Sequence, residues 1–105
     1  MLELNKVLMV GTLVADPDTR ALASGTSVAN FRLAVNRRFR DRSGETQKET
    51  VFIDVEAWGR LAEFCQNWLK KGRHVFVEGR LKQDTWEAQD KTKRSRILVN
   101  ADRVQ

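Results

Sequence analysis

Two regular spacings of apolar residues occur in this chain, and together they constrain its fold more than any other feature. Most apolar residues alternate with polar ones, as in 28–36, where Ala29 and Phe31 alternate with Asn30 and Arg32. A spacing of two is typical of β-strands with one buried face. The segments with this pattern, or with a short run of β-branched and aliphatic residues, are 4–14, 28–36, 50–58, 74–82 and 96–104.

Between the third and fourth segments the apolar spacing becomes three and four residues. Leu61, Phe64, Trp68 and their apolar neighbours predict one amphipathic helix after Gly59. The helix is expected to end at 70–72 (KKG), where two lysines complement the negative end of the helix dipole and a glycine follows. Five strands with one helix between the third and fourth predict an all-β, five-stranded Greek-key barrel of the OB-fold type. A chain of 105 residues has room for one such domain, 1–105.

Two polar segments are expected to form mobile hairpin tips. Residues 40–49 (RDRSGETQKE) and 86–94 (WEAQDKTKR) are rich in charges and turn residues. A third turn is predicted at 16–18 (DPD), because proline lacks the N–H that a sheet ladder needs.

Apolar residues occupy both faces of the first predicted strand. One face carries Leu4, Leu8 and Val10, and the other carries Val7, Met9 and Leu13. This pattern fits a strand covered by the barrel on one side and by a second subunit on the other. It fits a central strand of a monomer equally well.

Large aromatic residues on the expected solvent face of the strands are the strongest functional signal. In 50–58 the inward residues are odd-numbered, so Phe52 and Trp58 share the outward face with Asp54 and Glu56. Exposed aromatics among charges are unfavourable unless a partner covers them. Phe39 lies among arginines where the second strand runs into its loop, and Trp86 lies past Lys82 in the other hairpin.

Aromatics interleaved with cations can hold single-stranded nucleic acid. Bases stack on the rings for about 1–3 kcal/mol each, and Lys or Arg neutralises the phosphates. Phe39, Phe52, Trp58 and Trp86 are therefore the predicted stacking residues. The alternative is that such rings cover a barrel end or a partner subunit. This alternative is favoured for Phe76 and for Trp68, which lies on the apolar stripe of the helix.

The net charge of +5 and pI near 9.9 favour an acidic partner such as nucleic acid, although charge alone does not establish one. No segment approaches the roughly 20 apolar residues of a membrane span. The N-terminus lacks a secretory pattern. The single cysteine excludes an internal disulfide, in agreement with a cytoplasmic location.

Catalytic patterns are absent from the sequence. His74 and Cys65 are the only residues of their types, which disfavours a His/Cys zinc site or a supported Cys–His pair. Cys65 belongs to the apolar stripe of the helix and is expected in the core. No phosphate-cradling glycine motif occurs. We therefore expect no enzymatic activity, no metal and no cofactor.

Several short motifs resemble those of bacterial single-stranded DNA-binding proteins. They occur in the same order as in that family and together cover nearly the whole chain. The N-terminal half contributes 5–7 (NKV), Val10-Gly11, Asp16-Pro17 with Arg20, and Gly25 followed by 28–31 (VANF) and 33–34 (LA). The C-terminal half contributes 58–63 (WGRLAE), 69–72 (LKKG) and 77–81 (VEGRL).

The resemblance implies an OB-fold that forms a homotetramer and wraps single-stranded DNA, protecting it in DNA replication, recombination and repair in the bacterial cytoplasm and nucleoid. The family's stacking positions correspond to the four aromatics above. Its basic positions correspond to Lys6, Lys48, Arg60, Lys71 and Lys82. Outward position and charge add Arg32, Arg37, Arg38 and Arg80 as phosphate contacts.

The chain departs from the family pattern in two respects. Asp54 and Asp84 stand where a basic residue would suit DNA, which is expected to lower affinity. The family usually continues into a flexible linker and an acidic tip that recruits replication and repair proteins, whereas this sequence stops at Gln105. Recruitment of those partners is therefore expected only if the native protein carries such a tail.

Two other binding functions remain open. A small OB-fold adaptor of replication restart would bind single strands weakly, hold partner proteins and form a dimer. An RNA-binding OB module would prefer RNA over DNA of the same sequence. An enzyme is the least favoured reading.

Overall fold

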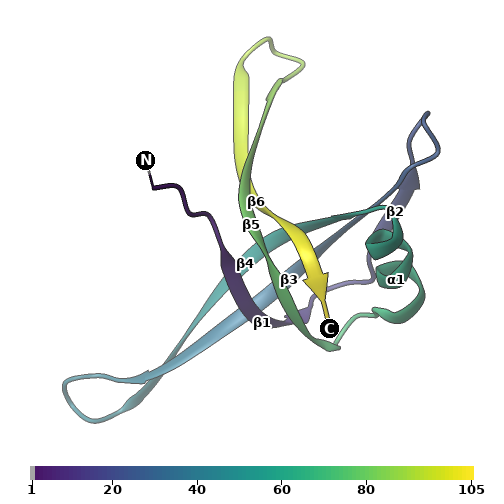
Figure 1. Cartoon of the computed structure of the whole chain (residues 1–105). Coiled ribbons are helices and arrows are strands. Elements are labelled where there is room, and N and C mark those ends of the chain that lie inside the picture. Colours follow the sequence, from purple (N-terminus) through teal and green to yellow (C-terminus); the bar gives the residue numbers. More distant parts are fainter. Residues whose placement is uncertain (1) are drawn as a thin grey trace.

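Six strands and one helix follow one another in the computed structural model, which describes residues 2–105 (Figure 1). In chain order they are β1 (Val7–Leu13), β2 (Asp18–Ala21), β3 (Ser27–Arg40), β4 (Thr46–Trp58), α1 (Arg60–Trp68), β5 (His74–Glu87) and β6 (Lys93–Val104).

Hydrogen bonds join the strands in the order β1-β5-β6-β4-β3-β2, and a further pairing of β1 with β3 closes the sheet. β1, β3, β4, β5 and β6 thus form a closed five-stranded barrel, and α1 lies between β4 and β5 in the sequence. The predicted all-β OB-fold with one helix is confirmed. β2 was not predicted; it pairs with β3 and adds a short strand at the edge, directly after Pro17.

Odd-numbered residues of the long strands fill most of the barrel interior, as alternation requires. Phe31 and Leu33 of β3 meet Val55 and Ala57 of β4 in one apolar core. α1 closes on this core, with Ala62 and Cys65 buried as predicted for Cys65. The full core cluster consists of Leu13, Ala29, Phe31, Leu33, Val55, Ala57, Ala62, Cys65, Leu69, Val75, Val77, Val99, Ala101 and Val104.

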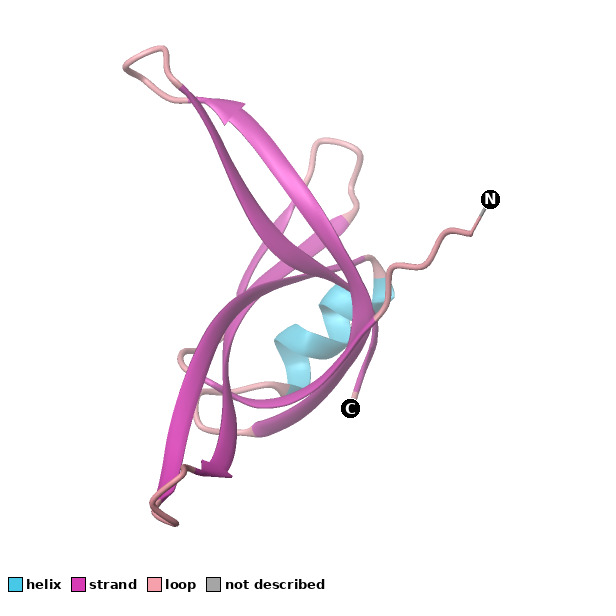
Figure 2. Cartoon of the chain, turned by 90° about the vertical axis from the view of Figure 1, so that its left-hand side faces the viewer, coloured by secondary structure: helices cyan, strands magenta, loops and turns pink. Residues whose placement is uncertain are grey.

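Two long hairpins, β3–β4 and β5–β6, extend away from the barrel as arms (Figure 2). Their turns span only 41–45 and 88–92, so the predicted tips 40–49 and 86–94 were too long. The ladders continue through polar sequence, and some of the directly opposed residues carry opposite charges, as in the 2.6 Å pair of Arg37 and Glu49.

Side-chain hydrogen bonds close both turns tightly. In the first, Asp41 Oδ1 accepts from the backbone N–H groups of Ser43 and Glu45. In the second, Asp90 Oδ1 accepts from the N–H and hydroxyl of Thr92. These Asx-type contacts compete well with water at a turn, so short turns suffice.

The exposure of three side chains differs from what the sequence predicts. Val51, predicted inward, is 56% exposed, since the β4 ladder has already passed the core at that point. Glu56 lies on the outward side of β4, as predicted, but it is hydrogen-bonded to Lys82 and Asn100 and is only 4% exposed. Trp68, expected to cover a barrel end or a partner subunit, covers no barrel end: it is 61% exposed.

Candidate nucleic-acid interface

One outer surface runs across β3, β4, β6 and β5 and is built from even-numbered residues. Directly opposed residues of paired strands lie on the same side of a sheet. The register opposes Arg32 to Asp54, Ala34 to Phe52, Asp84 to Arg96 and Trp86 to Arg94, and it pairs Glu56 with Asn100 between the parallel strands β4 and β6. We call residues 28–34, 52–58, 80–86 and 94–100 with even numbers the even face.

Three of the four predicted stacking residues lie on the even face with exposed rings. Phe52 is 54% exposed, Trp58 is 40% exposed and Trp86 is 45% exposed. The guanidinium of Arg32 lies 5.4 Å from the ring centroid of Phe52, and Lys82 Nζ lies 5.7 Å from that of Trp58. Each pair places a cation beside an aromatic ring, as a base and its phosphate require.

The fourth aromatic, Phe39, lies on the opposite side of the β3–β4 ladder. It is opposed to Gln47, an odd-numbered residue, and Arg37 lies over its ring at 4.5 Å. Arg37 also donates to Glu49, which lowers the pKa of that carboxyl. The structure therefore does not unite Phe39 with the other three rings on one continuous surface.

Like charges oppose each other farther along the same arm. Arg38 of β3 is directly opposite Lys48 of β4, and neither forms an ion pair with a carboxylate of residues 2–105. Like charges in this position destabilise a hairpin unless an anion neutralises them. These two predicted phosphate contacts are therefore well suited to a polyanion.

A buried carboxylate anchors the middle of the even face. Glu56 Oε1 accepts hydrogen bonds from Lys82 Nζ and Asn100 Nδ2, both at 2.8 Å. Burial by itself would raise the pKa of Glu56, but the hydrogen bonds from Lys82, Asn100 and Trp58 outweigh it and lower the pKa. Glu56 therefore stays ionised and holds Lys82 beside the Trp58 ring.

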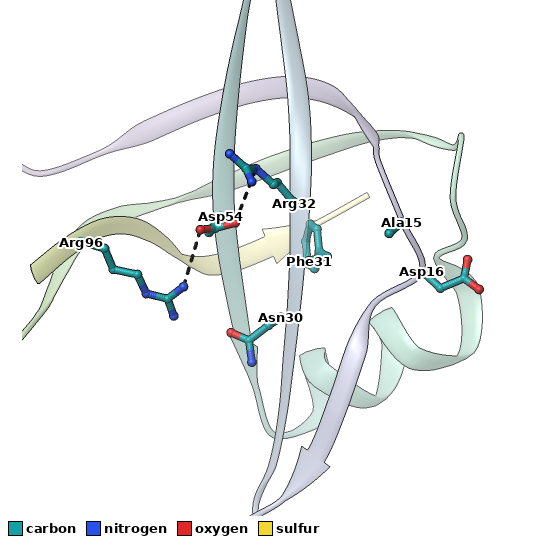
Figure 3. Close-up of a pocket in the computed structure, with 7 residues that line it drawn as sticks. All are labelled: Ala15, Asp16, Asn30, Phe31, Arg32, Asp54 and Arg96. Carbon is teal, nitrogen blue, oxygen red and sulfur yellow. Dashed lines mark ion pairs between the residues drawn. The ribbon is translucent and has the colours of Figure 1, made fainter. Parts of the chain in front are cut away.

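Asp54 and Asp84, which are expected to lower the affinity for DNA, are each flanked by cations. Asp54 lies 3.9 Å from Arg32 Nε and 3.5 Å from Arg96 Nη1, in a hollow of about 230 Å³ (Figure 3). Asp84 lies 3.8 Å from Arg96 Nη2 and 3.7 Å from Lys82 Nζ. These are long, half-exposed contacts of small energy, so phosphates can compete for the same cations.

Two arginines of the even face were missed at the sequence level, Arg94 and Arg96. Arg96 joins Trp86, Asp84 and Thr85 around an open hollow of about 400 Å³. Both arginines are even-numbered residues of β6. Across the hairpin, Arg94 opposes Trp86 and Arg96 opposes Asp84. Counting back from the short turn at 88–92 would have identified them.

The remaining predicted phosphate contacts lie at three different places. Arg80 is on the even face, 3.1 Å from Asp102. Lys6 precedes β1 and lies 3.9 Å from Glu78. Arg60 opens α1, and Lys71 lies in the turn after it, where its backbone N–H donates to Asp16. Arg60 and Lys71 therefore lie at α1 and not in the four strands of the even face.

The two residues considered for catalysis, Cys65 and His74, lie in different environments. Burial raises the pKa of the Cys65 thiol to about 11, which disfavours the reactive thiolate. His74 Nδ1 contacts Thr12 Oγ1 at 3.1 Å. Within residues 2–105, no group of three or more His, Cys, Asp or Glu side chains could hold a metal ion. No helix in this part of the chain is long and apolar enough to cross a membrane.

A closed five-stranded barrel whose outer face carries exposed aromatics among cations defines an OB-fold of the nucleic-acid-binding class. Residues 4–105 match the model of the single-strand binding protein family. The chain belongs to that family.

Individual relatives agree with this assignment. The chain is 49% identical over 84 residues to single-stranded DNA-binding protein 1 of Chlorobaculum tepidum, covering 80% of this chain and 52% of the relative. It is 43% identical over 106 residues to single-stranded DNA-binding protein 2 of the same organism, covering 100% and 72%. The chain thus spans between about half and about seven tenths of the length of these relatives.

A solved structure shares the fold. The Plasmodium falciparum SSB in complex with ssDNA superimposes with a TM-score of 0.88 at 26% identity, covering 100% of this chain and 94% of that one.

Proposed function

We propose that this chain binds single-stranded DNA without sequence preference, protects it in DNA replication, recombination and repair, and performs no covalent chemistry on it. The observation that carries the proposal is the even face, where Phe52, Trp58 and Trp86 are exposed beside Arg32, Lys82 and Arg94. The relatives named as single-stranded DNA-binding proteins support the same ligand.

Binding has two components in this proposal. Bases stack on the rings, which accept any base because every base has a π-face. Phosphates replace the weak carboxylate partners of the even-face cations and release counterions. Arg38 and Lys48 extend the basic surface along the β3–β4 arm, and Phe39 offers a ring on the opposite side of that arm. Lys6, Arg37, Arg60, Lys71 and Arg80 are proposed as further phosphate contacts.

The proposal predicts tight, salt-sensitive binding of labelled oligo-dT of about 35 nucleotides, longer than the roughly 4–16 that one OB-fold covers. The logarithm of the association constant should fall with the logarithm of salt concentration, with a slope of about −0.7 per phosphate neutralised. Fluorescence anisotropy over a salt series measures this. Equal competition by duplex DNA would contradict single-strand binding, and stronger competition by RNA of the same sequence would favour the RNA module.

We also propose that the chain self-associates, as a homotetramer, through the outer side of β1. Leu8 and Val10 lie on that side and are 60% and 59% exposed. Because their neighbours on the other side face the barrel, the apolar pattern on both faces of this strand is explained by a second subunit.

Replacing Leu8 by Glu is therefore expected to reduce the molar mass from four chains to two or one, because charge repels across an apolar contact. Light scattering coupled to gel filtration measures the mass. Ile97→Glu, which puts the same charge on an equally exposed apolar residue of β6, serves as the matched control. A wild-type chain that is already a dimer would favour the adaptor function, and a tetramer unaffected by Leu8→Glu would refute this contact.

A bacterial cytoplasmic, nucleoid-associated location follows from the proposed ligand. Replication and repair proteins are proposed as partners only where the native protein continues into an acidic tail.

A further inference from the structure

Helix α1 carries an exposed stripe of two aromatics that the proposed function has not used. Phe64 is 37% exposed and Trp68 is 61% exposed. They are four residues apart, and Arg60 is four residues before Phe64, so all three follow one another along one side of the helix. Ala62 and Cys65 face the core instead. We call Arg60, Phe64 and Trp68 the α1 stripe.

The exposure of Trp68 needs a physical explanation. A large apolar ring in water costs free energy, and large exposed apolar side chains that lie together often mark binding surfaces. Trp68 belongs to a helix that is otherwise well seated on the barrel, with Leu69 directly after it only 6% exposed. Its exposure is therefore a property of its position on the helix and does not come from a frayed end.

The charges around the α1 stripe indicate what covers it. Arg60 stands at one end, and exposed Lys70, Lys71 and Arg73 follow the other end. Glu63 is the acidic residue of the helix. Aromatic rings flanked by cations at both ends repeat the composition of the even face, which suits a polyanion with stackable rings.

The α1 stripe follows the even face directly in the sequence. Trp58 is the last residue of β4 and Arg60 is the first of α1. Gly59 joins them at φ 63°, a conformation that favours glycine and lets the chain pass from strand to helix without a loop. From Arg60 to Trp68 the helix rises roughly 12 Å.

We propose that the α1 stripe is a second stacking track for single-stranded DNA, on which Phe64 and Trp68 hold bases and Arg60, Lys70 and Lys71 hold phosphates beyond Trp58. This inference rests on the proposed function and extends it. It gives Arg60 and Lys71 a place on the DNA path although they lie outside the even face.

The three tryptophans of the chain allow each track to be observed separately. In Trp58→Phe/Trp86→Phe, the emission comes from Trp68 alone. In Trp58→Phe/Trp68→Phe, it comes from Trp86 alone and reports on the even face. Binding of oligo-dT of about 35 nucleotides is followed in parallel by anisotropy of a label on the DNA, so that saturation is known independently of quenching.

The expected result is that DNA quenches Trp68 as well as Trp86. Quenching of Trp86 without quenching of Trp68 at saturation would overturn the second track and leave the proposed function intact. Absence of binding in the anisotropy of the wild-type chain would overturn the proposed function itself. Protection of Trp68 from acrylamide in the free protein would show that a second copy covers it, and would also overturn the inference.

Affinity gives an independent test. Trp68→Ala should weaken binding of the long oligonucleotide by about fivefold or more, the loss of one stacked base, while Trp68→Phe keeps a ring and should lose much less. Oligo-dT of roughly eight nucleotides, short enough for one track, should bind both variants alike. Equal long-oligonucleotide affinities for the Ala and Phe variants would contradict stacking at this position.

Discussion

Replacing Trp58 and Trp86 together by alanine is expected to weaken binding of oligo-dT by roughly 2–6 kcal/mol, a loss of about 30-fold to 10⁴-fold. Each ring is exposed to an incoming base, and each is adjacent to a cation, Lys82 beside Trp58 and Arg94 opposite Trp86. Removing the rings leaves those cations in place. Most of the loss should therefore come from stacking, and the salt slope should change little.

The matched control is Trp58→Phe/Trp86→Phe, which keeps two smaller rings and is expected to retain most of the affinity. Both variants are titrated by anisotropy with labelled DNA, and thermal unfolding monitored by circular dichroism shows whether the fold survives. Alanine and phenylalanine variants with the same affinity would show that these positions do not stack bases.

The outward position of the proposed stacking residues on β4 could be predicted from the sequence because strand parity is a local property. Phe52 and Trp58 fall on the outward side of β4 whatever the strand pairs with, and the register confirms that they share a side with Trp86. The environment of Glu56 is different. Its burial depends on Lys82 of β5 and Asn100 of β6, which only the closed barrel brings to β4.

The position of Phe39 shows a second limit of parity. Like the rings of the even face, Phe39 lies among cations. As an odd-numbered residue, however, it lies on the side of β3 that faces the core within the barrel. It is accessible only because the β3–β4 arm extends past the barrel (Figure 2). Cross-strand charge pairs such as Arg37 with Glu49 support this arm, whereas composition alone placed Glu49 in a loop.

The alignment of the β5–β6 arm with the rest of the even face depends on one glycine. The pairing of β5 with β6 shifts register between Glu78 and Gly79, so that Glu78 opposes Arg103 while Gly79 opposes Ala101. Beyond this bulge, Arg80 opposes Asn100, the residue that donates to Glu56. The extra residue is Asp102 of β6, so beyond Gly79 the even-numbered residues of β6, including Arg94 and Arg96, share a side with Lys82, Asp84 and Trp86 of β5.

Gly79 also permits an unusually close approach of the two strands. A Cβ at this position would lie 2.2 Å from the backbone oxygen of Asn100 and 3.0 Å from Ala101 Cα. Both are main-chain atoms, so no side-chain rotation relieves the clash. β6 would have to move away from β5, which would weaken the ladder and withdraw Asn100 from Glu56.

Gly79→Ala is therefore expected to lower the free energy of unfolding by about 3 kcal/mol or more, at or above the upper end of the usual cost of overpacking. Gly44→Ala is the matched control: it lies in an exposed turn with nothing within 4 Å of the added Cβ, and its φ of 86° should cost only about 1–2 kcal/mol. Urea unfolding monitored by circular dichroism measures both. Because the bulge positions the even face, Gly79→Ala should also weaken DNA binding under conditions where it remains folded, and Gly44→Ala should not. Equal stability of the two variants would show that β6 relaxes freely at this point, and that the close approach at Gly79 does not fix the register of the arm.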